Sequence, residues 1–410
     1  MMALRVCALS ALLVTMVTAA HAQTPPPPAP EAKTEAKPED KPKTFWEENI
    51  LFAYVENSYV WNLGHTGRHD TNELRLYDFN AGYSFNMAEF SIKKDPSERY
   101  PFGYGLVVTA GRDAQKNHAI GIFRDDNDNF PFRNTPKFDL QEAYVSGLIP
   151  LGTGITVKAG KFVTLLGYEV IEAPLNLNFS RSFLFTLAIP LTHVGALVSY
   201  APFDWLNLTA GPVVGWDIAD DNNGTPSWMG QIAVTPMKDL TTNLNWIVGK
   251  EYSYDAVGHL RNGLGPRYVL DLVATYTGIK NLTLGVNVDY GHEIEEGFLR
   301  STVHPRDDNN ATWWGYAAYA AYDWTDKLRT ALRGEFFTDR EGARTGFGQK
   351  VDLWEMTATA QYKIWRGLLG RAEFRHDQAD TKMFKVRAPG LTPTSRTQDT
   401  VTFVLDYLFF

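Results

Sequence analysis

The stretch LRTALRGEFF, residues 328–337, alternates between apolar and polar side chains with a period of two. One parity carries Leu328, Thr330, Leu332, Gly334 and Phe336, and the other carries Arg329, Ala331, Arg333, Glu335 and Phe337. Successive side chains of a β-strand point to opposite faces, so this segment predicts a strand with one face for lipid and one for water. Soluble barrels alternate too, but they hide the apolar face inside.

The same period recurs from residue 50 to the end of the chain, in segments of roughly ten residues. A strand tilted by about 45° needs about that length to cross the hydrocarbon of a membrane. In lipid every backbone N–H and C=O group must be paired internally, and strands achieve this only in a closed sheet. The predicted strands span residues 50–61, 84–93, 103–114, 138–149, 155–165, 191–200, 206–217, 227–236, 241–252, 267–277, 281–292, 312–323, 328–338, 351–362, 368–377 and 400–409.

The connectors between these segments alternate between short and long. Those after even-numbered strands are short and rich in turn-forming residues, as in 95–97 and 150–152, whereas those after odd-numbered strands are long and polar. Outer-membrane proteins show this arrangement, with short periplasmic turns and long extracellular loops. We therefore predict an all-β fold, a transmembrane antiparallel up-and-down β-barrel of about 16 strands with both termini in the periplasm.

The first residues, 1–22, have the pattern of a secretory signal peptide. Arg5 precedes an apolar run, and Ala20-His21-Ala22 forms a small-x-small cleavage site. The run is short for a membrane anchor and lacks basic flanking residues at its end. We expect export from the cytoplasm and a place in the outer membrane of a Gram-negative bacterium.

The next segment, residues 23–45, is composed mainly of Pro, Ala, Glu and Lys. Such a composition cannot bury a core, so it predicts a disordered periplasmic tether in front of a barrel at residues 46–410. The one cysteine, Cys7, lies inside the signal peptide. The mature chain is therefore expected to hold no disulfide and no thiolate metal ligand.

The end of the chain carries a candidate membrane-assembly signal. The last predicted strand has an unbroken apolar parity and ends on aromatic residues; the residues concerned are Phe403, Leu405, Tyr407, Phe409 and Phe410. This pattern resembles the terminal strand that the barrel assembly machinery recognises in outer-membrane proteins. The unbroken parity counts back from Phe409 rather than from the final residue, because Asp406 interrupts the other one.

A family resemblance rests on residues 176–200, NLNFSRSFLFTLAIPLTHVGALVSY. Asn178-Phe179-Ser180-Arg181-Ser182 and Pro190-Leu191-Thr192-His193-Val194-Gly195 carry it, with supporting matches at 58–59, 85–89 and 142–145. These motifs resemble those of the outer-membrane β-barrel porins of the OmpL-like kind. The resemblance implies an outer-membrane barrel and a passive channel, and it implies no particular substrate.

A barrel of about sixteen strands is too wide for side chains alone to fill, so an aqueous channel is expected. The third outer loop, about residues 166–190, is unusually apolar for a solvent loop, which predicts that it folds inward and narrows the channel. Glu169, Glu172 and Arg181 are the candidate residues of the constriction. Fixed charges of this kind bias which ions enter a pore.

Further charges fall on the water-facing parity of two late strands, and they are candidates for the wall of the lumen. They are Arg329, Arg333, Glu335, Arg371, Glu373 and Arg375. The simpler interpretation is that each of them only solvates the lumen or pairs with a charge on a neighbouring strand. The sequence does not decide between these two interpretations.

No catalytic pattern stands out, and we predict neither an enzyme nor a cofactor nor a metal site. Acidic outer loops such as 124–129 contain oxygen ligands for divalent cations, but solvated loops are the better explanation. The expected partners are membrane lipid and lipopolysaccharide, the assembly machinery and small hydrophilic solutes or ions, with no nucleic acid. A homotrimer is expected by analogy of fold alone. The alternatives are a non-conducting structural or adhesive barrel plugged by its loops and a secreted soluble β protein.

Overall fold

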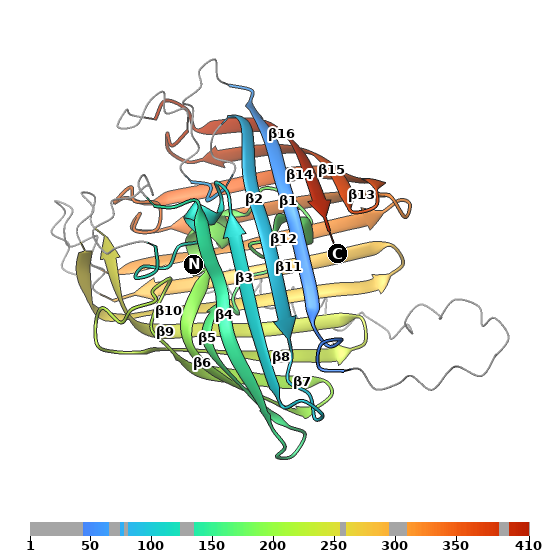
Figure 1. Ribbon diagram of the computed structural model, residues 1–410. Coiled ribbons are helices and arrows are strands. Elements are labelled where there is room, and N and C mark those ends of the chain that lie inside the picture. Colours follow the sequence, from blue (N-terminus) through green and yellow to red (C-terminus); the bar gives the residue numbers. More distant parts are fainter. Residues whose placement is uncertain are drawn as a thin grey trace.

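The computed structural model describes residues 44–64, 74–77, 81–123, 135–254, 260–294, 310–384 and 393–409. Sixteen strands follow one another around a closed barrel, each antiparallel to its neighbours (Figure 1). The strands are β1 (Ile50–Asn62), β2 (Gly82–Lys94), β3 (Phe102–Ala110), β4 (Phe138–Ile149), β5 (Ile155–Val163), β6 (Thr192–Phe203), β7 (Leu206–Val213), β8 (Ser227–Met237), β9 (Leu240–Tyr254), β10 (Leu260–Ile279), β11 (Leu282–Glu293), β12 (Ala311–Asp323), β13 (Leu328–Asp339), β14 (Val351–Trp365), β15 (Leu368–Ala379) and β16 (Thr397–Leu408). The predicted fold class is confirmed.

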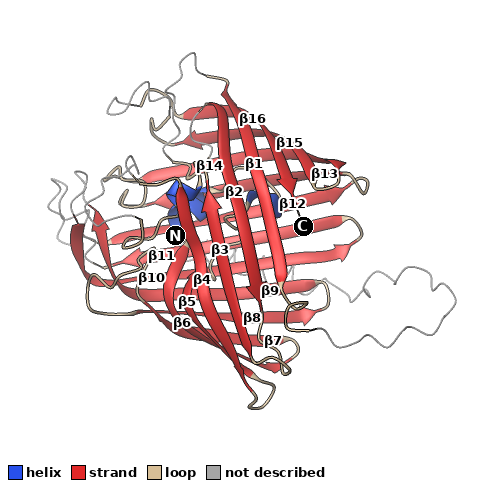
Figure 2. Cartoon of the chain, viewed as in Figure 1, coloured by secondary structure: helices blue, strands red, loops and turns tan. Residues whose placement is uncertain are grey.

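The barrel closes where the first strand meets the last. β1 pairs antiparallel with β16, from Tyr54 opposite Leu408 to Asn62 opposite Thr400. Closure pairs the N–H and C=O groups of every strand on both sides and leaves no open edge, as a membrane requires. Short segments of helix are few (Figure 2), and no helix among the described residues is long and apolar enough to cross a membrane.

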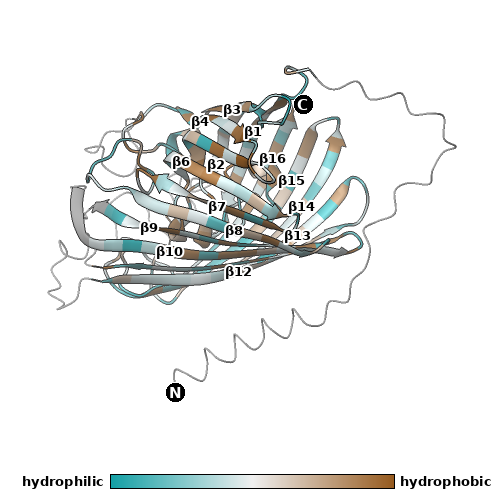
Figure 3. Cartoon of the chain, turned by 90° about the horizontal axis from the view of Figure 1, so that it is seen from below, coloured by the Kyte–Doolittle hydropathy of each residue, from teal (hydrophilic) through white to brown (hydrophobic). Residues whose placement is uncertain are grey.

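The predicted alternation of side chains is present along the strands (Figure 3). On β13 the side chain of Leu332 is 58% exposed on the outer face, whereas its neighbours Arg333 and Glu335 are buried inside the barrel. On β11 Val286 is exposed outside and Asn287 is buried inside. The outer face is therefore the apolar one, as expected for a barrel surrounded by lipid.

Some strand ends differ from the prediction. β3 stops at Ala110, because Gly111 takes a positive φ of 129° and turns the chain into a short 3₁₀ helix, η1 (Ala114–Lys116). β10 begins at Leu260 rather than at residue 267, because its backbone still pairs with Tyr254 of β9. A register shift between Asn262 and Pro266 lets this pairing continue past a proline, which cannot donate to the ladder.

The predicted signal peptide, residues 1–22, lies outside the described residues. The same holds for residues 23–43 of the predicted tether, for residues 124–129 of the acidic outer loop and for Phe410. These predictions remain predictions.

Candidate functional site

The connector between β5 and β6, residues 164–191, lies inside the barrel, and we call it loop L3. It contains two short helical segments, η2 (Ala173–Leu175) and η3 (Leu184–Ala188). η3 packs against β11 and β12, on the far side of the barrel from the strands that L3 connects. L3 therefore crosses the interior instead of extending into the medium.

The apolar residues of L3 explain why it turns inward. Phe183 and Leu184 are completely buried, and Phe185 and Leu187 are 4% and 7% exposed. Transfer of such side chains from water into an apolar environment stabilises each by about 1.5–3 kcal/mol. They gain this stabilisation only by packing against the barrel wall and the other loops. The prediction that this loop is folded inward thus agrees with where the loop lies.

Two wall carboxylates, those of Glu335 on β13 and Glu373 on β15, each accept two adjacent backbone N–H groups of L3. The donors are Phe183 and Leu184 to Glu335, at 2.9 and 2.7 Å, and Phe179 and Ser180 to Glu373, at 2.7 and 3.0 Å. Hydrogen bonds to an ionised acceptor are about twice as strong as neutral ones. Both carboxylates therefore fix the backbone of L3 to one side of the wall.

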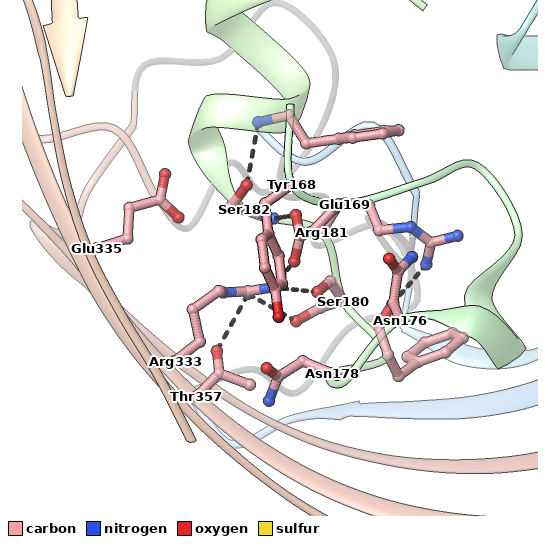
Figure 4. Close-up of polar contacts among 12 residues, drawn as sticks. Tyr168, Glu169, Asn176, Asn178, Ser180, Arg181, Ser182, Arg333, Glu335 and Thr357 are labelled. Carbon is pink, nitrogen blue, oxygen red and sulfur yellow. Dashed lines mark hydrogen bonds and ion pairs between the residues drawn. The ribbon is translucent and has the colours of Figure 1, made fainter. Parts of the chain in front are cut away.

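Three wall arginines complete this attachment by donating to backbone carbonyl oxygens of L3. The pairs are Arg333 with Ser180, Arg371 with Ala173 at 2.7 Å, and Arg375 with Arg181 at 2.5 Å. Figure 4 shows Arg333 among the polar groups of L3. These arginines also pair with wall carboxylates, as Arg333 does with Glu355 at 2.6 Å. The structure thus brings five of the six predicted wall charges onto L3.

Glu169 and Arg181 lie within L3 and connect its parts. Glu169 forms an ion pair with Arg333 at 2.6 Å and accepts the N–H of Ser182 at 2.7 Å. Arg181 is 4% exposed and donates to carbonyl oxygens of L3, among them that of Val170 at 3.1 Å. These two of the three predicted constriction residues are therefore buried where the loop is attached.

Glu172 occupies a different position, on the side of L3 that faces β4. Its carboxylate is half-buried and accepts an N–H of the Gln141 side chain at 2.6 Å. Burial raises the pKa of Glu172, because the charged form is poorly solvated there. A cavity of about 370 Å³ lies beside it, between L3 and the inner faces of β1, β2 and β4.

The other end of L3 is attached to β10, β11 and β12. The N–H of Gly167 donates to Asp271 at 3.1 Å, and that of Tyr168 donates to Asn287 at 3.2 Å. The ring of Tyr168 stacks on Tyr319, with ring centroids 4.2 Å apart. L3 is therefore held along a continuous stretch of the wall, from β10 to β15.

An apolar layer covers L3 on the extracellular side. It combines wall residues with residues of the outer loops, and it includes Tyr77, Trp216, Trp313, Phe337 and Phe384. Trp313 is completely buried and donates its ring N–H to the carbonyl oxygen of Ala188 at 3.1 Å. The outer loops therefore pack onto L3 as well as onto each other.

The remaining predicted residues lie elsewhere. Arg329 lies near the start of β13, at the end of the barrel where the short turns are. It forms an ion pair with Asp323 at 2.7 Å, and both side chains are about 40% exposed. Phe403, Leu405 and Phe409 are exposed on the outer face, where the assembly signal was expected to present its apolar parity. Tyr407 is half-buried beside them.

Two histidines of the strands, His193 and His376, are engaged in polar contacts. His193 is buried with one ring nitrogen 2.9 Å from the carbonyl oxygen of Gly215 and the other 3.1 Å from Thr164 Oγ1. His376 lies 2.7 Å from Asp399. His193 thus joins the ends of L3 to the neighbouring loop.

Sequence reasoning missed several residues of this site. Asp271 and Asn287 hold L3 but belong to no motif that stood out. Glu89 lines the cavity; it falls within the match at 85–89, where no role was predicted for it. The available signal was the parity of each strand, which places these polar residues inward. Their partners were not visible, because Asn287 and Tyr168 are 119 residues apart in the sequence.

The comparison with known families decides what kind of barrel this is. The family model described as "Putative beta-barrel porin-2, OmpL-like" matches residues 51–410. The chain belongs to this family. It is an outer-membrane porin, and the resemblance inferred from residues 176–200 is confirmed. Membership indicates a channel rather than an enzyme.

Solved outer-membrane proteins share the fold. The trimer form of in-vitro folded OmpT, an outer membrane protein of Vibrio cholerae, aligns with a TM-score of 0.56 at 11% identity, over 88% of this chain and 99% of that one. The outer membrane channel DcaP of Acinetobacter baumannii gives 0.55 at 10%, over 88% and 97%. An anion-selective porin from Comamonas acidovorans gives 0.55 at 10%, over 88% and 99%. At these identities the likeness concerns the fold alone, and no curated protein matches the sequence.

Proposed function

We propose that L3 forms the narrowest part of the porin channel and that small hydrophilic solutes and ions diffuse passively past it. The observation that carries this proposal is that L3, which starts at β5 and ends at β6, is attached to the wall between β10 and β15, through Asp271, Glu335 and Glu373. A loop held in this way occupies a fixed part of the cross-section. What passes is then set by the space that the loop leaves.

That space lies on the side of β1, β2 and β4, where the cavity beside Glu172 is found. Ile50, which faces inward at the periplasmic end of β1, is 61% exposed, so water reaches this side of L3. Glu169 and Arg181 shape the constriction by holding the loop, whereas Glu172 presents a carboxyl group to the passing solute. In this proposal the predicted constriction residues therefore have two different tasks.

A swelling assay with proteoliposomes tests the proposal. Sugars of increasing size define the cut-off of the native chain, and the double variant Glu335→Ala/Glu373→Ala removes four acceptor contacts to L3. We expect the variant to admit larger sugars. The matched control is Glu98→Ala, because Glu98 is exposed in a periplasmic turn. An unchanged cut-off in a folded double variant would contradict the proposal.

A second candidate function is a non-conducting barrel that L3 and the outer loops plug. The observation in its favour is the apolar layer above L3, in which Trp313, Phe337 and Phe384 are completely buried. Single-channel recording of the refolded native chain in potassium chloride separates the two candidates. Stable conductance steps support the channel, whereas a silent, correctly folded barrel supports the plug.

The proposal extends to the partners of the porin. The outward residues Phe403, Leu405 and Phe409 offer an apolar face to membrane lipid, lipopolysaccharide and the barrel assembly machinery. A homotrimer is proposed because a neighbour in fold, OmpT of Vibrio cholerae, has a trimer form. Native mass spectrometry of the detergent-extracted porin checks this, and a monomer as the sole species would contradict it.

A further inference from the structure

The cavity beside L3 has the size and the lining of a ligand site. Its volume is about 370 Å³. Small-molecule sites are typically cavities of about 300–1,000 Å³ with an apolar lining and a few polar groups. The apolar part here comes from residues such as Phe52, Leu166, Ile171 and Phe185. Such a lining favours an alkyl or aryl group over a fully hydrated ion.

The polar part of the cavity is mainly acidic. Four carboxylates line it, those of Glu89, Glu142, Glu169 and Glu172, together with one lysine, Lys93. Two of these carboxylates have a cation at ion-pair distance. Glu142 is 2.9 Å from Lys93, and Glu169 is 2.6 Å from Arg333.

Glu89 and Glu172 have no such cation within the part of the chain that the structure describes. Glu172 accepts only a neutral amide N–H, from Gln141. Glu89 is 5% exposed, and its Oε2 atom has no hydrogen-bond partner there. A buried carboxylate without a donor loses its hydration without replacement, which costs free energy. A cationic donor in the cavity would remove this cost at Glu89 and would give Glu172 a counter-charge.

A metal ion does not fit this cavity. The described residues contain no group of three or more His, Cys, Asp or Glu side chains arranged to hold a metal ion. Calcium takes six to eight oxygen ligands and magnesium takes six, whereas the two carboxylates without a cation in the described structure offer four oxygens. An ammonium group carries only three donors, so two carboxylates and a water molecule satisfy it.

We propose that this cavity binds a small organic cation, in which an alkyl or aryl group lies against Phe52, Leu166 and Phe185 and an ammonium group lies between Glu89 and Glu172. The inference rests on the proposed function and deepens it, because it names a class of solute that occupies the space left by L3. Access is from the periplasmic side, where Ile50 and Leu175 line the cavity and are 61% and 60% exposed.

Isothermal titration calorimetry of the refolded full chain in detergent tests this inference. The probe is 2-phenylethylammonium chloride, and the uncharged comparison is 2-phenylethanol, at the same pH and ionic strength. We expect saturable binding of the amine and binding of the alcohol that is weaker by about tenfold or more, because charge-assisted hydrogen bonds are lost. Equal affinities for the two probes would overturn the inference, and this arm needs no variant.

The variant Glu89→Gln removes the unpartnered charge and changes almost no volume. We expect it to weaken binding of the amine by about tenfold or more, whereas the exposed-turn control Glu98→Gln leaves the affinity unchanged. Unchanged affinity in a folded Glu89→Gln variant would overturn the inference. A competition experiment adds a further test, in which potassium chloride and tetramethylammonium chloride compete with the amine at one concentration. The inference is also overturned if the two salts compete equally and the cavity shows no preference for the amine over the alcohol.

The two proposals fail in different ways. A barrel that conducts ions but binds no amine overturns the ligand site and leaves the channel. A barrel that binds the amine but is silent in single-channel recording overturns the channel and identifies the cavity as a site in a plugged barrel.

Discussion

The two sides of the barrel interior differ in how their charges are used. On β13–β15 the charges of Arg333, Glu335, Glu373 and Arg375 all contact L3 or a neighbouring charge. On β1–β4, within the described structure, the Oε2 atom of Glu89 has no hydrogen-bond partner, and a cavity lies beside it. The difference shows that similar inward-facing charges have two structural roles. One wall holds the loop, and the other faces the space that the loop leaves.

The strongest test of the holding wall is Arg333→Met, which keeps a long apolar stem and removes the charge. Glu169 then stays buried without its cation, and Glu355 keeps only Arg375, at 3.7 Å. Breaking a buried ion pair costs about 3–5 kcal/mol. We expect the free energy of opening of L3 to fall by that order. Amide hydrogen exchange in L3 measures it, for example at Ser182, whose N–H donates to Glu169.

The matched control lies on the same strand. Arg329→Met removes an ion pair that is about 40% exposed, and such pairs contribute about 0–1 kcal/mol. Exchange in L3 should be nearly unchanged. Similar losses in both variants would show that the holding wall is not special and would remove the comparison between the two sides.

Glu373→Ala is expected to have a smaller effect than Arg333→Met. The N–H groups of Phe179 and Ser180 lose their acceptor, and an unsatisfied buried group costs about 1–3 kcal/mol. Exchange should therefore accelerate at these two amides. The amide of Gly167, which is held by Asp271 on β10, serves as the internal reference. Equal acceleration at both ends would mean that L3 opens as one unit.

The surplus of negative charge near β1 predicts a dependence on pH. Burial, with the nearby Glu56 carboxylate, raises the pKa of Asp113 to about 7. The folded state therefore holds a proton that the unfolded chain releases above its ordinary pKa near 4. Stability from this group is present at low pH and is lost as the pH rises from about 4 to 7. Denaturant unfolding at pH 5 and pH 8 should show a lower free energy of unfolding at pH 8, and Asp113→Asn should reduce the difference between the two pH values. A native chain that is more stable at pH 8, with a variant that behaves in the same way, would contradict this.

The smallest effect is expected at the cavity. Glu89→Gln removes a charge that has no counter-charge within hydrogen-bond reach, so we expect the opening of L3 to change by no more than about 1 kcal/mol, toward higher stability. Hydrogen exchange in L3 measures this in the same way as for Arg333→Met. A loss as large as that at Arg333 would show that Glu89 also holds the loop.

The barrel was predictable because its signal is local. The alternation from Leu328 to Phe337 can be recognised from neighbouring residues alone, and the structure shows it in β13. The ends of β9 and β10 were not predictable in this way. Pro266 and the glycines before it indicate a loop, whereas the backbone of β10 continues to pair with β9 beyond a register shift.

The use of the charges was not predictable, because their partners are distant in the chain. The inward position of L3 followed from its apolar residues, yet Glu335 receives the N–H of Phe183 from 152 residues away. Nothing in the spacing near Glu335 distinguishes an anchor of L3 from a charge of an open lumen. Glu89 on β2 also faces inward, and only the folded structure shows that its Oε2 atom has no hydrogen-bond partner among the described residues.

Removal of L3 followed by single-channel recording tests the central claim most directly. The ends of the loop meet, since the N–H of Thr164 donates to the carbonyl oxygen of Leu191 at 2.9 Å, so a short Gly-Ser connector can replace residues 167–188. We predict that the shortened barrel conducts several times more current in potassium chloride than the native chain and has a different reversal potential in a salt gradient. The same conductance and the same reversal potential in both proteins would contradict the account.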